Sequence, residues 1–165
     1  MGTDSAIRLR STLRPGDLGT IIRLHGTIYG AEYGWDETFE AMVAADIARF
    51  VIADDVVGRL WVAERGGEVA GCVGIVGQAD GSAQLRWFLV DPAHRGAGIG
   101  RMLLDEALAF CRERGFRSVF LWTVRGLDAA AHLYRAAGFA VTQEETHVRW
   151  GATVTEQRYD LSVGN

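Results

Sequence analysis

The spacing of hydrophobic and polar residues in the first third of the chain predicts a strand and two helices. Residues 7–13 alternate between the two kinds of side chain, which is typical of a strand with one buried face. Residues 18–29 repeat hydrophobic side chains at helical spacing, and residues 38–52 place theirs on one side of a second helix. The intervening residues 30–36, GAEYGWD, are rich in glycine and aromatic residues and predict a loop.

The middle of the chain predicts three consecutive antiparallel strands. Residues 59–65 and 68–78 are strand-like and flank the pair Gly66 and Gly67, which is typical of a tight hairpin turn. Residues 83–90 follow the turn sequence ADGS and form the third strand-like segment. Short turns of this kind connect antiparallel neighbours, so the three segments predict a meander.

The last third of the chain alternates between helical and strand-like patterns. Asp128 is the expected N-cap of one helix, and Gly138 is expected just past its C-terminal end. No internal repeat or linker is visible, so the sequence predicts one α+β (mixed α/β) domain over residues 1–165. The predicted segments are helices at about 99–114 and 128–137 and strands at 118–124, 139–148 and 153–162.

The composition is that of a globular protein with an acidic balance. Hydrophobic residues make up 48% of the 165 residues and charged residues 23%, which excludes a disordered chain. The net charge of −4 argues against nucleic acid as a partner, because phosphate backbones need a basic face.

Several further absences bear on location and cofactors. Hydrophobic runs fall short of the ~18 residues that span a bilayer, so no membrane partner is expected. The first residues lack a hydrophobic leader, and Cys72 and Cys111 show neither metal-binding nor redox spacing. We therefore expect a cytoplasmic protein with reduced thiols and no metal.

The segment Arg95–Arg101, RGAGIGR, carries the most informative chemistry. Its three glycines lie between a predicted strand and a predicted helix, where they leave backbone N–H groups free to turn toward one point. The first N–H groups of a helix lack partners and lie at its positive end. The segment therefore predicts a binding site for a phosphate or pyrophosphate, with Arg95 and Arg101 adding charge.

The motif differs from two common phosphate-binding loops. A P-loop requires Gly-Lys-Ser/Thr, whereas Gly100 is followed by Arg101 and Met102. A dinucleotide-binding fingerprint requires glycine where Arg101 stands, and it follows a βαβ unit rather than a meander. A glycine-rich turn without any ligand remains the alternative.

The segment from Val90 to Phe116 resembles the acyl-coenzyme-A-binding segment of the GNAT superfamily of N-acetyltransferases. That segment reads Arg/Gln-x-x-Gly-x-Gly/Ala, and Arg95, Gly98 and Gly100 stand in its slots. A second family feature, LYxxxGF, is matched by LYRAAGF at 133–139. Residues 25–44 are also similar to acetyltransferase domains that are fused to MarR-type regulators, here without a DNA-binding segment.

The resemblance implies a fold and a coenzyme site. The implied sheet is twisted and mostly antiparallel, with about seven strands, a splayed parallel pair at its centre and about four flanking helices. Acetyl-CoA is the implied co-substrate, and an amine attacks its thioester directly. The pantetheine would bind the backbone of Phe88, Leu89 and Val90. The pyrophosphate would meet the N–H groups of Arg95, Gly96, Ala97, Gly98, Ile99, Gly100 and Arg101.

The resemblance also implies catalytic residues, and here the sequence departs from the family. Tyr134 is the expected general acid for the departing thiolate; its alternative is a core aromatic residue. Family members often carry glutamate near the position of Gln84 and asparagine at that of Leu127, and both are missing. The remaining base candidates are Glu32, Glu145 and His147, together with Asp36 and Glu37.

The amine acceptor is expected beside residues 30–36. Tyr33 and Trp35 are candidates to contact the apolar body of a substrate, and Asp36 would attract its ammonium group. Arg86, together with Arg125, would instead suit an acceptor that carries a carboxylate. The sequence leaves this charge open.

Two classes of function follow from these residues. The first is an enzyme that moves acetyl from acetyl-CoA to a primary amine, expected to be a small molecule. The second is a CoA-binding regulatory module with little turnover. This alternative remains because the glutamate and asparagine found in many family members are missing. Family members often pair through their C-terminal strands, so a homodimer is also expected.

Overall fold

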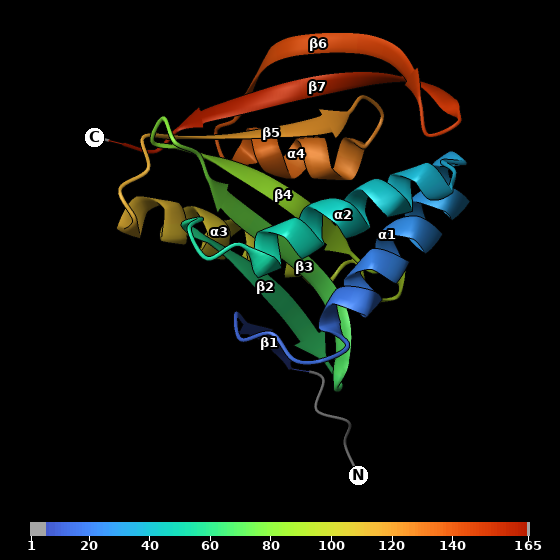
Figure 1. Cartoon of the computed structure of the whole chain (residues 1–165), viewed down its shortest axis with the longest axis horizontal. Coiled ribbons are helices and arrows are strands. Elements are labelled where there is room, and N and C mark those ends of the chain that lie inside the picture. The colour runs from blue at the N-terminus through green and yellow to red at the C-terminus, as the bar shows by residue number, and fades with distance from the viewer. Residues whose placement is uncertain (1–5, 165) are drawn as a thin grey trace.

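The computed structural model describes residues 6–164, in which a single mixed sheet runs in the order β1-β2-β3-β4-β5-β7-β6 (Figure 1). All neighbouring strands in this part of the chain are antiparallel except β4 and β5. The strands are β1 (Ile7–Arg10), β2 (Gly58–Arg65), β3 (Glu68–Gly77), β4 (Ser82–Val90), β5 (Ser118–Val124), β6 (Ala140–Arg149) and β7 (Ala152–Ser162). The expected twisted, mostly antiparallel α+β sheet is confirmed.

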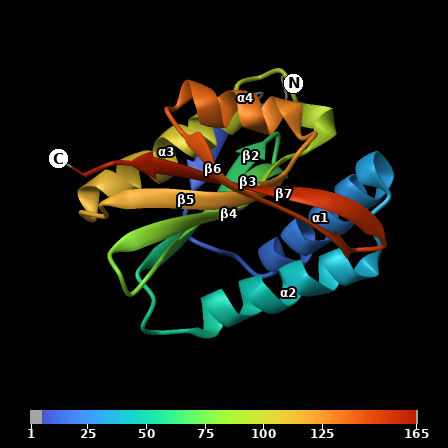
Figure 2. The same cartoon turned by 90° about the horizontal axis from the view of Figure 1, so that it is seen from above.

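The helices cover both faces of this sheet (Figure 2). They are α1 (Asp17–Tyr33), α2 (Glu37–Ile52), α3 (Ile99–Glu113) and α4 (Asp128–Ala136), with a short 3-10 turn at Pro92–His94. α1 and α2 pack on one face, and α3 and α4 on the other. None of these helices combines the length and hydrophobicity needed to cross a bilayer.

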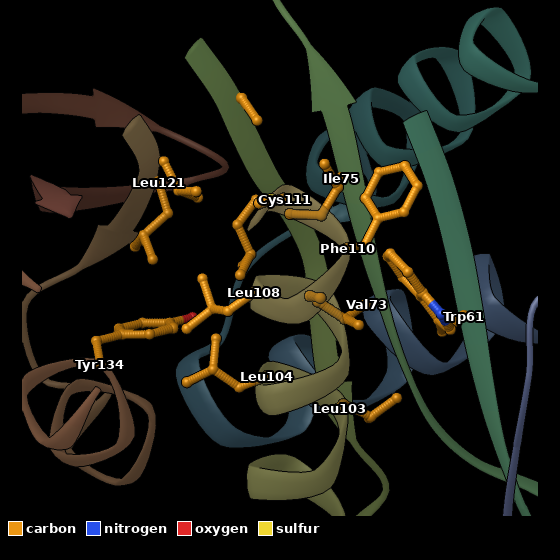
Figure 3. Packing of buried hydrophobic residues seen from close by; sticks show 14 of the residues in the cluster. Trp61, Val73, Ile75, Leu103, Leu104, Leu108, Phe110, Cys111, Leu121 and Tyr134 are labelled. Atoms are coloured by element: carbon orange, nitrogen blue, oxygen red, sulfur yellow. The ribbon is translucent and has the colours of Figure 1, made fainter. Parts of the chain in front are cut away.

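Each face has its own hydrophobic core. On one side, Leu104 and Leu108 of α3 lie next to Tyr134 of α4 and the strands behind them (Figure 3). On the other side, Ile21 of α1 and Ile47 of α2 are fully buried against the sheet. Both cores are needed to hold the central strands, because every buried strand presents side chains to both faces.

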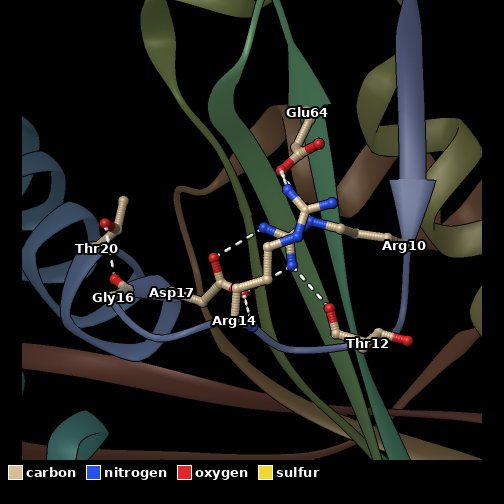
Figure 4. Close-up of polar contacts among 7 residues, drawn as sticks. All are labelled: Arg10, Thr12, Arg14, Gly16, Asp17, Thr20 and Glu64. Carbon is tan, nitrogen blue, oxygen red and sulfur yellow. Dashed lines mark hydrogen bonds and ion pairs between the residues drawn. The ribbon is translucent and has the colours of Figure 1, made fainter.

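Arg10 joins the first strand to the first helix and to β2 (Figure 4). Its guanidinium donates two hydrogen bonds to the Asp17 carboxylate, at 2.6 and 2.8 Å, and one to Glu64 at 2.8 Å. Asp17 also accepts a hydrogen bond from the Arg14 amide. The Arg10 partner holds the pKa of this buried carboxyl below its ordinary value.

Three expected boundaries are wrong. The predicted loop over residues 30–36 is largely helix, because α1 continues through Gly30 and ends at Gly34 in the left-handed conformation. The N-cap of α4 is Leu127, and Asp128 is its first helical residue. β1 ends at Arg10, short of the predicted residue 13. Gly138 does end α4 as predicted, with a φ of +101°.

We expect Asp17→Asn to destabilise the protein by about 2 to 3 kcal/mol at pH 7, since Arg10 loses the carboxylate that accepts two of its hydrogen bonds and keeps only Glu64. The folded-state pKa of Asp17 is depressed, so its contribution is present above the unfolded pKa of about 4 and is lost as pH falls through the folded value. The deficit, measured by urea unfolding, should therefore shrink below pH 4. The exposed control Asp54→Asn should stay within about 0.5 kcal/mol of the parent, and equal losses in both variants would contradict the assignment.

Candidate functional site

The site begins where β4 and β5 separate. The two strands pair in parallel only over three positions, Ser82–Gln84 with Ser118–Phe120. β4 then continues to Val90 and β5 to Val124 without further pairing to each other, and Figure 1 shows the two strands diverging. The backbone of β4 beyond Gln84 therefore has one edge free of a neighbouring strand. The splayed parallel pair expected from the sequence is confirmed.

A β-bulge in β4 re-aims the side chains at this edge. Cys72 of β3 pairs with Leu89 and Gly74 with Arg86, so two β4 residues, Trp87 and Phe88, lie opposite one β3 residue. Trp87 has a φ of +50°, which is unusual for a bulky residue. As a result Leu85 faces α3 and α4, whereas Trp87 and Leu89 face α1 and α2.

Two β3 residues hold the bulge in place. The Cys72 thiol donates a 3.1 Å hydrogen bond to the Trp87 carbonyl, and burial raises its pKa to about 12, so it stays protonated. Gly74 leaves room for the displaced ring, because a Cβ there would lie 2.5 Å from Trp87 Cε3. The bulge is thus shaped by side chains on the neighbouring strand.

The glycine segment lies between the end of β4 and the start of α3. Gly96 and Gly98 both have positive φ, at +83° and +78°, and a Cβ at either would meet open space. The first α-helical bond of α3 is donated by the Met102 amide. Within the described residues, the amides from Gly96 to Arg101 donate no hydrogen bond. This is a helix N-terminus with free donors and no side-chain cap.

A groove of about 350 Å³ runs past these amides. Its walls are the β4 residues Phe88, Leu89 and Val90, the glycine segment, the end of α1 and the start of α4. Arg95 and Glu32 form an ion pair across it at 2.9 Å. Glu32, a candidate base, therefore lies beside the glycine segment.

A second cavity of about 400 Å³ adjoins the groove, and Tyr29, Phe88 and Leu127 line both. Tyr134 lines this second cavity, which we call the inner pocket. Its hydroxyl has no hydrogen-bond partner within residues 6–164, and burial raises its pKa, so the phenol is neutral. A protonated phenol therefore lies in the pocket that adjoins the groove.

Aromatic rings form one side of the inner pocket. Trp35 stacks on Tyr29, with ring centroids 5.1 Å apart, and contacts Trp150 at 4.6 Å. Phe39 meets Tyr29 and Trp150 edge-on at 5.0 Å. Trp35, which the sequence suggested as a substrate contact, is buried within this aromatic side of the pocket. These rings offer a substrate an apolar, flat surface.

The charged residues of the inner pocket are mostly bonded to one another. Glu156 lies 3.0 Å from Arg149 and 3.1 Å from His147 Nε2. Arg86 donates to the Asp46 carboxylate at 2.5 Å, and the exposed Arg49 donates to the other oxygen of that carboxylate at 3.1 Å. Glu145 accepts a hydrogen bond from the uncharged Gln143 amide and has no cationic partner in the described part of the chain. The pocket therefore keeps one uncompensated carboxylate.

The remaining predicted residues take different places. Glu145 and Arg86 line the inner pocket, whereas Tyr33 lines the groove. Asp36 caps α2, where its carboxylate accepts from the Thr38 amide, and it lines neither cavity. His147 does not line either cavity, and its Nε2 is enclosed against Glu156. No cluster of three metal-ligating side chains occurs among residues 6–164.

Comparison with known proteins assigns this chain to a family. A family model described as Acetyltransferase (GNAT) family matches residues 23–139, more than half of the chain. The chain belongs to the GNAT acetyltransferase family. The matched range begins inside α1 and ends just past α4, so it includes every residue that lines the groove of this GNAT domain. Four residues of the inner pocket lie beyond it, namely Glu145, Arg149, Trp150 and Glu156.

Relatives and solved structures agree with that assignment. N-acetyltransferase 8 of Rattus norvegicus is 38% identical over 105 residues, which cover 61% of this chain and 47% of that protein. Mycothiol acetyltransferase of Cellulomonas flavigena is 49% identical over 53 residues, covering 32% of this chain and 15% of that protein. The chain thus spans about half, or less, of the length of these relatives.

Two solved structures share the fold across almost the whole chain. A GNAT acetyltransferase from Staphylococcus aureus Mu50 gives a TM-score of 0.75 at 19% identity, covering 96% of this chain and 99% of that one. YncA from Salmonella typhimurium, solved with its cofactor acetyl-CoA, gives 0.75 at 20% identity, covering 98% and 96%.

Among the titratable residues of the inner pocket of this GNAT domain, sequence reasoning missed three: His25, Arg149 and Glu156. His25 lies in the hydrophobic stripe of α1, one helical turn before Tyr29, which was the available signal. Arg149 and Glu156 come from neighbouring strands, and only their pairing across β6 and β7 brings them together.

We expect Gly74→Ala to destabilise the GNAT domain by about 1 to 3 kcal/mol in urea unfolding, because the new methyl group collides with the Trp87 ring. The control Gly19→Ala places its methyl group in open space on helix α1 and should stabilise by about 0.4 to 1 kcal/mol. If Gly74→Ala proved as stable as the parent, Gly74 would not be what makes room for the bulge.

Proposed function

We propose that this domain is an N-acetyltransferase that moves an acetyl group from acetyl-CoA to a primary amine, most simply that of a small molecule. The observation that carries this proposal is the junction of the two cavities. One cavity offers unpaired amides for a pyrophosphate, the other offers aromatic rings and a carboxylate for an amine, and they meet at Tyr29, Phe88 and Leu127.

The groove suits the coenzyme in shape and polarity. Pantetheine carries amides that pair with an open strand edge, and β4 beyond Gln84 has such an edge. The amides from Gly96 to Arg101 are free to hold the pyrophosphate, whereas the Arg95 amide donates to the Pro92 carbonyl. YncA, a structural relative, was solved with acetyl-CoA, which supports the same ligand here.

The reaction needs a proton to leave the amine and another to reach the sulfur. The neutral amine nitrogen attacks the thioester carbon, a C–N bond forms and the C–S bond breaks. The nitrogen loses one proton to solvent, and solvent returns a proton to Tyr134 after the thiol has left. Tyr134 donates its phenolic proton to the departing sulfur, for which its neutral state is the required one. The Leu89 backbone is turned toward Cys72 of β3, so a neighbouring N–H on the open edge of β4 is the candidate to polarise the thioester carbonyl.

The acceptor enters the inner pocket as a cation with an apolar body, and its ammonium group releases one proton to solvent before the neutral nitrogen attacks. The free carboxylate of Glu145 attracts an ammonium group, while the stacked rings of Trp35 and Tyr29 contact carbon atoms. Arg86 already donates to the Asp46 carboxylate, so an acceptor carboxylate gains little from it. These contacts favour an amine without a second, negative group.

We expect Tyr134→Phe to lower the rate of CoA release by about 100-fold or more, because the thiolate then leaves without its acid. The affinity for acetyl-CoA, measured by calorimetry, should change little. Tyr159→Phe is the matched control: its hydroxyl is enclosed and unpartnered next to Tyr134, so its removal should leave the rate unchanged. A Tyr134→Phe enzyme with the parental rate would exclude Tyr134 as the acid.

We expect Gly98→Asp to weaken acetyl-CoA binding by at least about tenfold, since it adds a negative charge and backbone strain beside the free amides. Gly115→Asp is the control, because Gly115 has a similar φ of +75°, an equally open surrounding and a position at the other end of α3. Calorimetry should show weak binding in the first variant only. Similar affinities in both would place the pyrophosphate elsewhere.

A CoA-binding regulatory module is the second candidate. Gln84 and Leu127, which replace the expected glutamate and asparagine, both line the inner pocket, so the usual base is missing from it. Tight acetyl-CoA binding without CoA release across a broad panel of primary amines would favour this second function.

A further inference from the structure

His25 is a buried imidazole that has no part in the proton transfers proposed above. It lies in the middle of α1, is 4% exposed, and lines the inner pocket. Its ring stacks on that of Tyr29 at 6.1 Å and is tilted toward Phe39 at 6.4 Å. The imidazole is therefore a polar group within the aromatic wall of the pocket.

The hydrogen bond of Nδ1 fixes the tautomer of this ring. Nδ1 lies 2.8 Å from the carbonyl oxygen of Ile21, and because a carbonyl only accepts, Nδ1 carries the proton. Burial lowers the pKa of His25 to about 4, so the ring is neutral at physiological pH. Nε2 consequently holds a lone pair and can only accept.

Nε2 has no partner and is open to the pocket. Among residues 6–164, protein atoms fully enclose two side-chain polar atoms that make no hydrogen bond: Tyr159 Oη, and His147 Nε2, which lies against the Glu156 carboxylate. His25 Nε2 also makes no hydrogen bond within these residues, but protein atoms do not fully enclose it, and the cavity that His25 lines is the inner pocket. A buried acceptor without a donor is costly unless a ligand or water supplies one.

We propose that His25 Nε2 accepts a hydrogen bond from an N–H of the acceptor amine and so positions that amine for attack. This inference rests on the proposed function. It assigns the acceptor class more narrowly: the substrate presents an N–H donor to Nε2 and places a flat, apolar body against the rings of Tyr29 and Trp35. A substrate that presents only carboxylate or ether oxygens there would repel the lone pair.

The contact assists the reaction by orientation. An amine that directs one N–H toward Nε2 has its nitrogen lone pair turned away from the imidazole, free to point at the thioester. His25 acts as a positioning residue in this scheme, and the weakly basic ring does not need to take the proton permanently. Its loss should therefore raise the KM for the amine more than the KM for acetyl-CoA.

A direct test is histidine ¹⁵N NMR of the whole chain, with 2-phenylethylamine, spermidine and lysine as probes. We expect His25 Nε2 to appear unprotonated in the free protein and to shift when 2-phenylethylamine is added. The exposed His132 should not shift. A protonated Nε2, or no shift at saturating amine, would overturn the proposal.

Variants provide the second test. We expect His25→Phe, which keeps a ring but no acceptor, to lower kcat/KM for 2-phenylethylamine by about 10- to 100-fold, the value of one hydrogen bond to an amine. The KM for acetyl-CoA should stay within about twofold. His25→Gln restores an acceptor oxygen and should recover part of the loss. His132→Phe and His132→Gln are the matched controls on α4 and should keep the parental kinetics.

The outcomes separate this inference from the proposed function. Turnover in the parent with an unchanged amine KM in His25→Phe would overturn the role of His25 and leave the acetyltransferase standing. A shift of Nε2 with 2-phenylethylamine, but no CoA release from the parent, would support the amine contact and contradict the enzyme. Neither shift nor turnover with any of the three probes would contradict both.

Discussion

The separation of β4 from β5 is the constraint on which the rest of this structure depends. If β4 and β5 continued to pair beyond Gln84 and Phe120, hydrogen bonds would occupy the whole β4 edge and close the space between the two strands. Instead the edge is open. The bulge at Trp87 adds one residue to β4, so the side chains of its last residues change faces. Phe88 and Val90 then face one core while Leu89 faces the other, so the strand serves both cavities.

This opening is stable because packing on both faces holds it from outside. From β3, the Cys72 thiol bonds the bulged backbone of β4 and Gly74 leaves room for the Trp87 ring. On the other side of the opening, β7 pairs with every residue of β5. The strained backbone of Trp87 is therefore supported from β3, as functional sites with unusual φ values require, while β7 holds β5 on the far side of the opening. The groove and the inner pocket are consequences of this arrangement.

Charge is distributed differently in the two cavities. The groove owes its positive character to free backbone amides, since the Arg95 side chain is occupied by Glu32. The inner pocket pairs Arg149 with Glu156 and Arg86 with Asp46, which leaves Glu145 and the neutral His25 to meet a ligand. An anion is thus favoured at one end of the site and an amine at the other.

The sequence by itself determined the order of elements, the glycine turn at Arg95–Arg101 and the family, because periodicity, turn residues and motif spacing are local properties. It misplaced the end of α1, since Gly30 reads as a helix breaker until the packing of Tyr29 and Tyr33 is known. Only the tertiary structure decided which charges are neutralised and which polar atoms reach the inner pocket. Those facts depend on strand pairing between β6 and β7 and on a bulge that inverts the alternation of β4, and neither leaves a local signal in the chain.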